Sequence, residues 1–541
     1  MGRRLNGRLL SRCFWVVVFH LGAEASAGVA LAEDGTASSV SKQAAAELAS
    51  RSIGSLDWAV IVLYMLGMLG VGAYYSWKVE TSDDYLLGGR NMKPWAVGLS
   101  LFATLLSTIT YLSLPGEVIK HGPMMLCSLL AYPFIAVAVG WLLIPHFMKL
   151  KVTSAYEVLE VRLGLQVRLV GAGLFLLLRL LWMAVIIYAT VSSVLIPLMG
   201  LSEAMTPWLC GILCLITIIY TSMGGLRAVV FTDAVQTAIL FGGVLLTLGM
   251  ISVDMGGVSQ WWPDQWDPNW QEPAIGYDPN QRVTLLGAMI ATFTMFVCMA
   301  GSDQMAIQRY LATRDVSSAR RMYVVSLVAG GVVQILLAFL GVALLSYYKV
   351  HPEYLLDGQT ITSDADLLFP QFISIGLPSG ISGLVVAGLL AAAMSSLSSG
   401  LNSSCSVVAI DFINRFRNDV NPQDHVQQFR VISIVLGVIV VLISSVVGSI
   451  EGNMLEIAFK VVNLLVAPLF GLFVMALFVP WANSSGTIVG AVAGVATACL
   501  VNYWPEITGT QGISFLWAMP LSLLVQTIVG MVISAIGPQR K

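Results

Sequence analysis

The chain has 541 residues, of which 57% are hydrophobic and only 11% are charged, and its formal net charge is −2. Because an ordinary soluble domain is roughly 25% charged, this composition excludes a soluble globular fold. The near-neutral balance also argues against nucleic acid or a strongly charged protein as a partner.

The first 32 residues have the pattern of a secretory signal peptide. Basic residues precede an apolar core over 13–22, and Ala30, Leu31 and Ala32 form a small-residue cleavage site. An uncleaved anchor helix is the alternative, although the core is short for a span. In either case we expect the polar segment 33–55 to lie outside the cytoplasm and the transmembrane domain to occupy 56–541.

Apolar runs of about 20 residues, each long enough to cross about 30 Å of hydrocarbon, recur through the rest of the chain. We therefore predict an all-α integral membrane protein with about thirteen transmembrane helices. Six of the seven cysteines fall in these runs and are expected to be small core residues. The predicted spans are 57–77, 95–116, 123–147, 169–197, 206–223, 228–252, 284–304, 322–347, 378–411, 431–449, 454–479, 487–503 and 514–536.

Loop charges indicate the orientation. Basic residues such as Lys149, Arg227 and Arg309 fall in or beside alternate loops, whereas the segments 254–281 and 350–377 contain no Lys or Arg. Because cytoplasmic loops are enriched in basic residues, we predict an external N-terminus, an odd number of spans and a cytoplasmic C-terminus. The expected location is the cell membrane, plasma or inner.

Two of the predicted spans are interrupted. The second carries Ser107, Thr108 and Thr110 at its middle, and the seventh contains a polar and glycine-containing stretch over 300–303. Such interruptions are typical of discontinuous helices around a binding site at the membrane midplane. Because the two lie five spans apart, we predict a five-plus-five inverted repeat formed by spans 2–6 and 7–11. One extra helix precedes the repeat and two follow it.

The ninth span contains a run of serines. Ser395, Ser399 and Asn402 share one helix face, with Ser396 beside it and Ala392 one turn earlier. Sodium is a hard cation that prefers oxygen ligands, and hydroxyls with free carbonyls supply them without adding charge. The alternative is that small hydroxyl residues let membrane helices pack closely. This run alone leaves both interpretations open.

Three of the charged residues inside predicted spans are candidates for the functional site. Asp233 is a candidate cation ligand, because a carboxylate within the membrane is expensive. The alternative is an interfacial aspartate that is partly paired with Arg227. Arg179 and Lys460 are candidates for contact with an anionic substrate, and the alternative for each is a side chain that extends to the membrane interface.

Several motifs occur in order between residues 84 and 411, and together they resemble the sodium:solute symporter family. The resemblance implies a LeuT-like inverted-repeat fold with alternating access, and co-transport of one or two sodium ions. The motifs lie at 84–90, 100–103, 115–117, 220–226 with Asp233, 303–311 and 391–403.

The resemblance also assigns site residues. A first sodium site would comprise the carbonyls of Ala103, Leu106 and Ala392 with the hydroxyls of Ser395 and Ser396. A second sodium site would comprise Asp233, Ser398 and Ser399, with Ser395 shared. Substrate would lie between the broken middles of spans 2 and 7 and spans 3, 4 and 11. Its candidate ligands are Ser107, Thr110, Ser302, Arg179 and Lys460.

The motifs also bear on the substrate. Leu105, Thr110 and Leu129 stand where sugar carriers of this family hold polar ligands, whereas the ending at 115–117 is similar to the branch for monocarboxylates, vitamins and iodide. We therefore expect sodium-coupled uptake of a small organic anion, a monocarboxylate or vitamin-like compound. The alternative within the class is a sugar or another neutral solute.

Three other functional classes are possible alternatives. A non-transporting solute sensor on the same scaffold would lack the ordered sodium ligands, and a channel would show no stoichiometric coupling. An enzyme is not expected, because the five histidines form no cluster with acids or cysteines. The expected partners are the solute, sodium and membrane lipid, with no nucleic acid and no obligate protein partner.

Overall fold

The computed structural model describes residues 54–150, 152–276, 283–356, 358–416, 422–447, 454–510 and 514–537. Within these residues every regular element is a helix. The predicted signal peptide and nearly all of the segment 33–55 lie outside the described residues.

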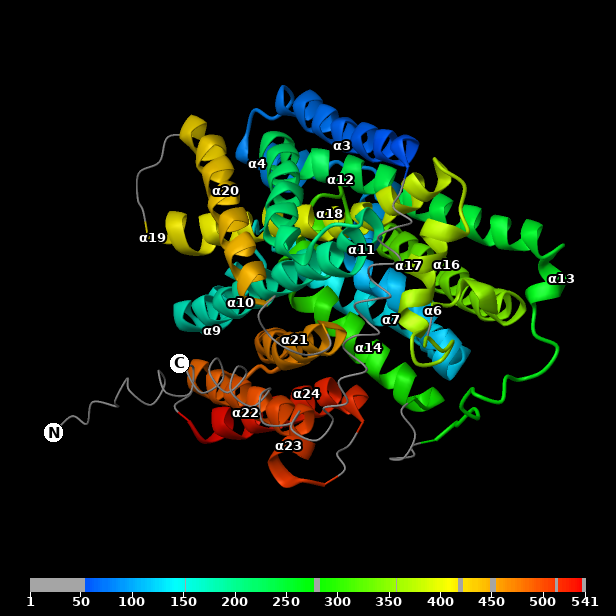
Figure 1. Cartoon of the computed structure of the whole chain (residues 1–541). Coiled ribbons are helices and arrows are strands. Elements are labelled where there is room, and N and C mark those ends of the chain that lie inside the picture. Colours follow the sequence, from blue (N-terminus) through cyan, green and yellow to red (C-terminus); the bar gives the residue numbers. More distant parts are fainter. Residues whose placement is uncertain are drawn as a thin grey trace.

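The described part of the chain contains ten helices that are long and apolar enough to cross a membrane, or eleven if one bent pair forms a single span. The chain is therefore a multi-pass helical membrane protein. Figure 1 shows α18 within the bundle and the C-terminal α22 and α24 side by side at its edge. The other principal helices are α3 (Ser55–Ser76), α9 (Glu157–Leu163), α10 (Leu165–Thr190), α16 (Val316–Val350), α17 (Ala365–Ile375), α20 (Pro422–Val447), α21 (Met454–Phe478), α22 (Ser484–Asn502) and α24 (Ala518–Ile536). A further run over 123–149 combines α7 (Tyr132–Val137) and α8 (Ile144–Lys149) with short 3₁₀ and π segments.

The longest helix, α12 (Thr206–Asp254), covers the predicted fifth and sixth spans. At about 1.5 Å per residue its 49 residues would reach about 74 Å if straight, more than twice the hydrocarbon thickness. Its regular backbone is interrupted at Gly225, where φ is 55° and ψ is −154°. A Cβ at Gly225 would lie 2.6 Å from the carbonyl oxygen of Tyr85, so only glycine fits this break.

The two predicted interruptions are present. Helix α5 (Pro94–Leu105) and α6 (Thr108–His121) are bent by 68° at their junction, where Leu106 and Ser107 are extended. Helix α14 (Leu285–Ser302) and α15 (Gln304–Leu311) meet at Asp303, which is also extended and caps α15. Both breaks therefore free backbone groups from helical hydrogen bonds inside the bundle.

Helix α18 (Ile381–Val407) carries the serine run, and nearly all of its residues are buried. It packs against α3, α5, α10, α12 and α20. At its beginning the Asp57 carboxylate of α3 accepts hydrogen bonds from the Gly380 and Gly383 amides and from the Ser382 hydroxyl. Small residues allow this close approach, because a Cβ at Gly383 would lie 2.6 Å from the Asp57 Cα.

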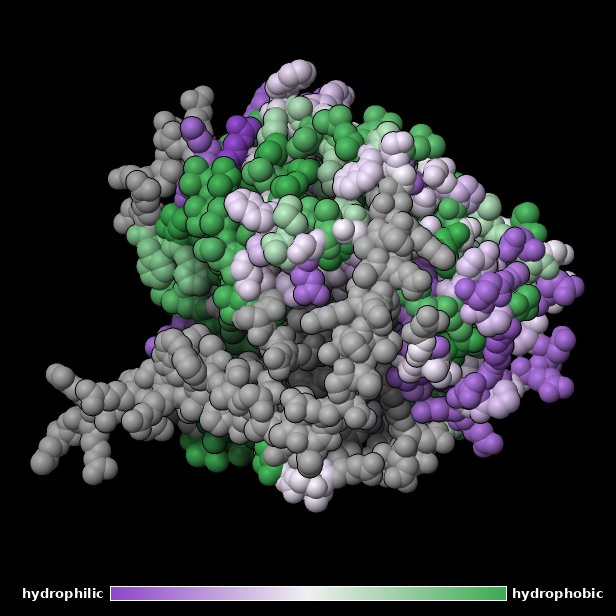
Figure 2. Space-filling model, viewed as in Figure 1, coloured by the Kyte–Doolittle hydropathy of each residue, from purple (hydrophilic) through white to green (hydrophobic). Residues whose placement is uncertain are grey.

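The surface agrees with a membrane environment. Figure 2 shows hydrophobic residues gathered over α3, α12 and α20, whereas hydrophilic residues gather near α13 (Val258–Trp261) and the segment after it. Exposed apolar side chains include Leu63 on α3, Leu215 on α12 and Leu442 on α20. Such a face would be an aggregation hazard in water and is suited to lipid.

Candidate functional site

The five residues predicted for the first sodium site lie together where α5 breaks. The hydroxyl of Ser395 donates to the carbonyls of Ala103 at 2.8 Å and Ala392 at 3.0 Å. The hydroxyl of Ser396 donates to the Leu106 carbonyl at 3.3 Å and to the Thr104 carbonyl at 3.1 Å. The structure thus gathers neutral oxygens from α5 and α18 into one buried cluster.

The helix break explains why these carbonyls are available. The last carbonyls of a helix have no intrahelical donor, and α5 ends at Leu105 with Leu106 extended. In an apolar interior such carbonyls need another partner, and here the serines of α18 provide it. The same oxygens have the chemistry that sodium requires, since hydroxyls and carbonyls are hard neutral ligands. Within the described residues no group of three or more His, Cys, Asp or Glu is placed to hold a metal ion.

Asp233 and Ser399 form a second cluster near the first. The Asp233 carboxylate, which is fully buried, accepts hydrogen bonds from Ser100 at 2.5 Å and from Ser399 at 3.4 Å. Its ion-pair partner is Arg309 of α15, at 3.2 Å. The alternative pairing of Asp233 with Arg227 is wrong, because Arg227 pairs with Asp84 at 2.7 Å.

Two further details of this cluster differ from the sequence analysis. Arg309 was counted among the charges of cytoplasmic loops, but its side chain is fully buried in the bundle. Ser398 is also buried, yet its hydroxyl donates to the Ser395 carbonyl of its own helix at 3.1 Å. Of the residues predicted for the second sodium site, the structure therefore links Ser399 directly to Asp233 by a hydrogen bond.

Arg179 lies at the break between α14 and α15. It reaches across from α10 and forms an ion pair with Asp303, and both side chains are buried. The alternative that Arg179 extends to the membrane interface is therefore wrong. Its Nε has no hydrogen-bond partner among the described residues. Lys460 is the other cationic candidate, and its side chain lies outside the described residues.

The remaining substrate candidates are tied to the two breaks. Ser107 caps α6, accepts from the Thr110 amide at 3.2 Å and lies 3.1 Å from the Thr110 hydroxyl. The Ser302 hydroxyl donates to the Cys298 carbonyl at 2.7 Å, and the Ser302 carbonyl accepts from the Tyr156 hydroxyl at 3.0 Å. The predicted solute ligands Ser107, Thr110 and Ser302 therefore do lie at the two helix breaks. Their hydroxyls contact groups within a few residues of the same chain segment.

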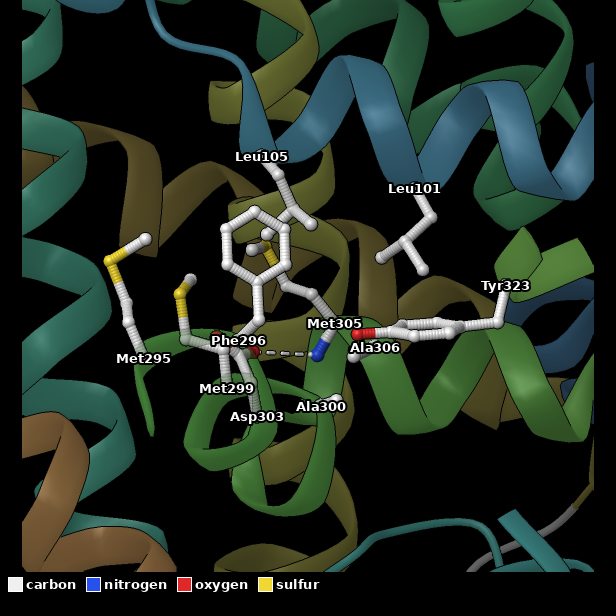
Figure 3. A pocket seen from close by; sticks show the side chains of 10 residues that line it. All are labelled: Leu101, Leu105, Met295, Phe296, Met299, Ala300, Asp303, Met305, Ala306 and Tyr323. Atoms are coloured by element: carbon white, nitrogen blue, oxygen red, sulfur yellow. Dashed lines mark hydrogen bonds between the residues drawn. The ribbon is translucent and has the colours of Figure 1, made fainter. Parts of the chain in front are cut away.

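A cavity of about 60 Å³ lies beside the second break, between α5, α14 and α16. In Figure 3 the Tyr323 hydroxyl points toward Met305, and the Met305 amide donates to the Asp303 carboxylate. The cavity is small for a solute site. Its lining is apolar apart from Asp303 and Tyr323, and consists of Leu101, Leu105, Met295, Phe296, Met299, Ala300, Asp303, Met305, Ala306 and Tyr323.

Two broken helices that bring buried neutral oxygens and paired charges to the centre of an apolar helical bundle define a secondary transporter. The sequence pattern described as "Sodium:solute symporter family" matches residues 85–494, which is most of the chain. The chain belongs to this family. The ion that is coupled to transport is therefore sodium.

Individual relatives agree. The chain is 32% identical over 466 residues to the sodium/sialic acid symporter SiaT of Proteus mirabilis, covering 84% of this chain and 91% of that protein. It is 29% identical to the sodium-coupled monocarboxylate transporter 1 of Mus musculus, covering 85% of this chain and 75% of the relative. These relatives are transporters and not enzymes, as the sequence analysis expected.

Solved structures support the fold. A sodium-coupled sialic acid symporter in a substrate-bound, outward-open state matches with a TM-score of 0.77 at 29% identity, over 90% of this chain and 99% of that chain. A nucleobase-cation-symport-1 family transporter in a closed conformation matches with a TM-score of 0.57 at 12% identity, over 84% and 96% of the two chains. The LeuT-like fold expected from the sequence is thus supported by solved neighbours.

The sequence alone did not predict Arg309, Ser100 and Thr104 as members of the Asp233 cluster. Arg309 follows a predicted span, so hydropathy and loop charge both placed it outside the bundle. A detectable signal was that Arg227 was the only partner considered for Asp233, although a buried carboxylate requires a counter-charge and other basic residues follow the next break.

Proposed function

We propose that this protein carries a small organic anion, a monocarboxylate or a vitamin-like carboxylate, into the cell together with two sodium ions by alternating access. The observation that carries the anion assignment is Arg179, a buried guanidinium at the α14–α15 break whose Nε has no partner among the described residues. An arginine binds a carboxylate best through two parallel hydrogen bonds. The solute carboxylate would replace Asp303 and would also engage the free Nε.

Named relatives support this substrate class. Those named above carry a sialic acid and monocarboxylates, and others are named as multivitamin and iodide transporters. Sialic acids and monocarboxylates share a carboxylate, and iodide is also an anion. Ser107, Thr110, Ser302 and Lys460 remain proposed solute ligands around Arg179. The alternative, a sugar or other neutral solute, would leave the Arg179 Nε without an anionic partner.

The sodium sites are also proposed residue by residue. The first ion would be bound by Ala103, Leu106 and Ala392 through carbonyls and by Ser395 and Ser396 through hydroxyls. The hydrogen bonds that already join these atoms support this assignment. The second ion would be bound by Asp233, Ser398 and Ser399.

The proposal includes the membrane arrangement. Each of the thirteen predicted spans overlaps one or more helices of the structure, so we propose thirteen spans with a five-plus-five repeat at the core. The N-terminus would lie outside and the C-terminus in the cytoplasm, and the signal peptide would be removed. The protein would contact lipid without an obligate protein partner.

Substitution of Arg179 with Gln tests the anion assignment. The variant should lose about 10- to 100-fold in affinity for a carboxylate, because a hydrogen bond to a charged group is worth about 1.5–3 kcal/mol. Binding of the neutral amide of the same solute should change little. The control is Arg320→Gln, because Arg320 stacks on Trp141 with 4.7 Å between its guanidinium carbon and the ring centroid.

The assay is uptake into vesicles with an imposed sodium gradient, after a thermal-shift screen of carboxylates and neutral solutes has identified a ligand. Equal losses for the acid and its amide would show that Arg179 acts through packing. Uptake at the same rate in potassium would exclude sodium coupling in this chain. Solute binding without uptake would favour the sensor.

A further inference from the structure

The Arg309 side chain is surrounded by oxygen atoms. Its Nη2 lies within hydrogen-bond distance of the hydroxyls of Thr104 at 2.6 Å, Ser399 at 2.6 Å and Ser100 at 2.8 Å. The same nitrogen lies 3.2 Å from the Asp233 carboxylate. Four oxygens, one of them anionic, thus surround a single cationic nitrogen deep in the bundle.

Two of these four oxygens belong to the proposed ligands of the second sodium ion, Asp233 and Ser399. A sodium ion that shared these two oxygens now contacted by Arg309, namely Asp233 Oδ2 and the Ser399 hydroxyl, would occupy the place where the Arg309 nitrogen lies. Both cations carry one positive charge, and two of them within hydrogen-bond distance in a dry interior repel each other strongly. The Asp233 site can therefore hold either the Arg309 guanidinium or a sodium ion, but not both at once.

We propose that the Arg309 guanidinium is an internal surrogate for the second sodium ion and that the two cations occupy the Asp233 site in turn. The inference rests on the second sodium site of the proposed function. Removing one member of a buried ion pair leaves a costly uncompensated charge, so Asp233 needs a cation in every state of the cycle. The second carboxylate oxygen, Oδ1, has no partner among the described residues and offers an incoming ion its first contact.

The alternation gives the site a means of releasing its ion. When sodium is bound, Arg309 is displaced and must find other partners. When the guanidinium returns, it replaces sodium without leaving Asp233 bare. The ion can then leave a buried carboxylate without the penalty of an isolated charge.

The same helix also carries the proposed contact with the solute. Helix α15 is capped by Asp303, which pairs with Arg179, and contains Arg309, which pairs with Asp233. A solute carboxylate would replace Asp303, and sodium would replace Arg309. Each exchange releases one of the two ion pairs that hold α15. The second ion and the anion would therefore raise each other's affinity by the same factor.

The first test is sodium binding to purified Arg309→Gln protein, measured with radioactive sodium in the absence of any solute. When Arg309 occupies the site, the apparent affinity for sodium is the intrinsic affinity multiplied by the fraction of molecules whose site is free. In Arg309→Gln the site is always free. The second ion should therefore reach half-saturation at a sodium concentration at least about tenfold lower than in the wild type. The control is Arg314→Gln, because Arg314 follows the same helix but is exposed and pairs with the adjacent Asp315. Its binding curve should match the wild type.

The second test replaces the side chain with its own head group. In Arg309→Ala protein, millimolar guanidinium chloride should displace the second sodium ion and leave the first, whereas wild-type binding should be unaffected. Unchanged or weaker sodium binding in both Arg309 variants, with folding confirmed by gel filtration, would overturn the proposal. Failure of guanidinium to compete would overturn it as well.

A variant that removes both charges separates an effect on sodium binding from a folding defect, because it leaves no unpaired buried charge. Asp233→Asn/Arg309→Gln removes both charges and should fold without sodium, yet it should bind one ion fewer than the wild type. If Asp233→Asn binds as many ions as the wild type, the second sodium site itself is wrong. If Asp233→Asn loses an ion but Arg309→Gln gains no affinity, the site stands and the surrogate is wrong. Because solute is absent throughout, a wrong substrate class does not affect these outcomes.

Discussion

The two clusters on α18 differ in how their buried polar groups are paired. The cluster at Ser395 and Ser396 contains only neutral oxygens, and its carbonyls are satisfied by serine hydroxyls. The cluster at Ser399 contains a carboxylate, and its charge is matched by Arg309. Neutral groups in a buried site need only hydrogen bonds, whereas a buried charge needs a counter-charge. A site of the first kind can remain without any cation, but a site of the second kind needs one, either a sodium ion or the Arg309 guanidinium.

Because of this difference, we expect the two sites to respond differently to substitutions. The first site depends on the α5 break, which presents carbonyls to the serine hydroxyls of α18. The second depends on two opposite charges, Asp233 of α12 and Arg309 of α15, together with the Ser399 hydroxyl of α18. Substitutions of hydroxyls should therefore change ion affinity modestly, while substitutions of charges should change both ion number and stability.

The largest effect is expected for Asp233→Asn. Breaking a buried pair by removing one partner typically costs about 3–5 kcal/mol, because Arg309 would remain buried without its counter-ion. The double variant Asp233→Asn/Arg309→Gln should recover most of this loss. Thermal stability in detergent, followed by the folded gel-filtration peak, measures both. Wild-type stability in the single variant would show that the pair contributes nothing and would remove the contrast between the clusters.

The next effect concerns voltage. Each elementary charge that crosses the membrane potential is worth about 2.3 kcal/mol per 100 mV, so two sodium ions with a monoanion would give a roughly 50-fold accumulation from that potential. One sodium ion with a monoanion would be electroneutral. Asp233→Asn should lower the Hill coefficient for sodium from about two to about one and abolish the voltage dependence of uptake.

Flux ratios in voltage-clamped vesicles provide the measurement for this prediction. The ratio of sodium to solute should be two in the wild type and one in the variant. A wild-type ratio of one, with uptake insensitive to voltage, would leave Asp233 as a structural carboxylate whose partner is always Arg309.

A smaller effect is expected for Ser396→Ala, which removes one neutral ligand of the first site. Sodium affinity should fall by about three- to tenfold, since a neutral hydrogen bond contributes about 0.5–1.5 kcal/mol, and the ratio of ions to solute should not change. The matched control is Ser404→Ala on the same helix, because the Ser404 hydroxyl has no partner among the described residues. Equal effects in the two variants would indicate helix packing in place of ion binding.

The sequence predicted features that depend on local pattern. The polar residues around Ser107 and the glycine before Ser302 indicated the two helix breaks, and helical periodicity placed Ser395 and Ser399 on one face. These features follow from the order of residues within one or two turns. Some hydroxyls of the serine run have partners within their own helix, because Ser398 and Ser403 donate to carbonyls of α18.

The sequence did not predict which charges meet. Arg179 and Asp303 are 124 positions apart, and Asp233 and Arg309 are 76 apart, so each pairing is set by tertiary structure. Arg309 was misplaced because a basic residue after an apolar run normally lies in a loop. Here α15 continues into the bundle after the break, and all of its residues are buried. Hydropathy cannot detect this continuation.

The smallest effect is expected at a partly exposed pair at the end of a membrane helix, where Arg415, near the end of the candidate span Ile381–Phe416, pairs with Glu160 of α9, which lies outside the candidate spans. Arg415 donates to Glu160 at 2.7 Å, and Arg168 also donates to Glu160 at 2.6 Å. The Arg415 side chain is 41% exposed, so water and salt screen its charge. Arg415→Gln leaves Arg168 in place and should lower thermal stability far less than Asp233→Asn.

The pH dependence of this pair has a definite sign. The hydrogen bond from Arg415 holds the pKa of Glu160 below its usual range. A carboxylate whose pKa is lower in the folded state stabilises the fold at every pH above its unfolded pKa of about 4.3, and this contribution is lost as the pH falls through the folded value. The difference in melting temperature between wild type and Arg415→Gln should therefore be constant from pH 8 to about pH 5 and should shrink at lower pH. It should also shrink at high salt, whereas the loss caused by Asp233→Asn should not, because screening does not reach a buried pair. A salt-insensitive loss in Arg415→Gln would show that this pair acts as a buried one and would contradict the distinction between the exposed and the buried charges.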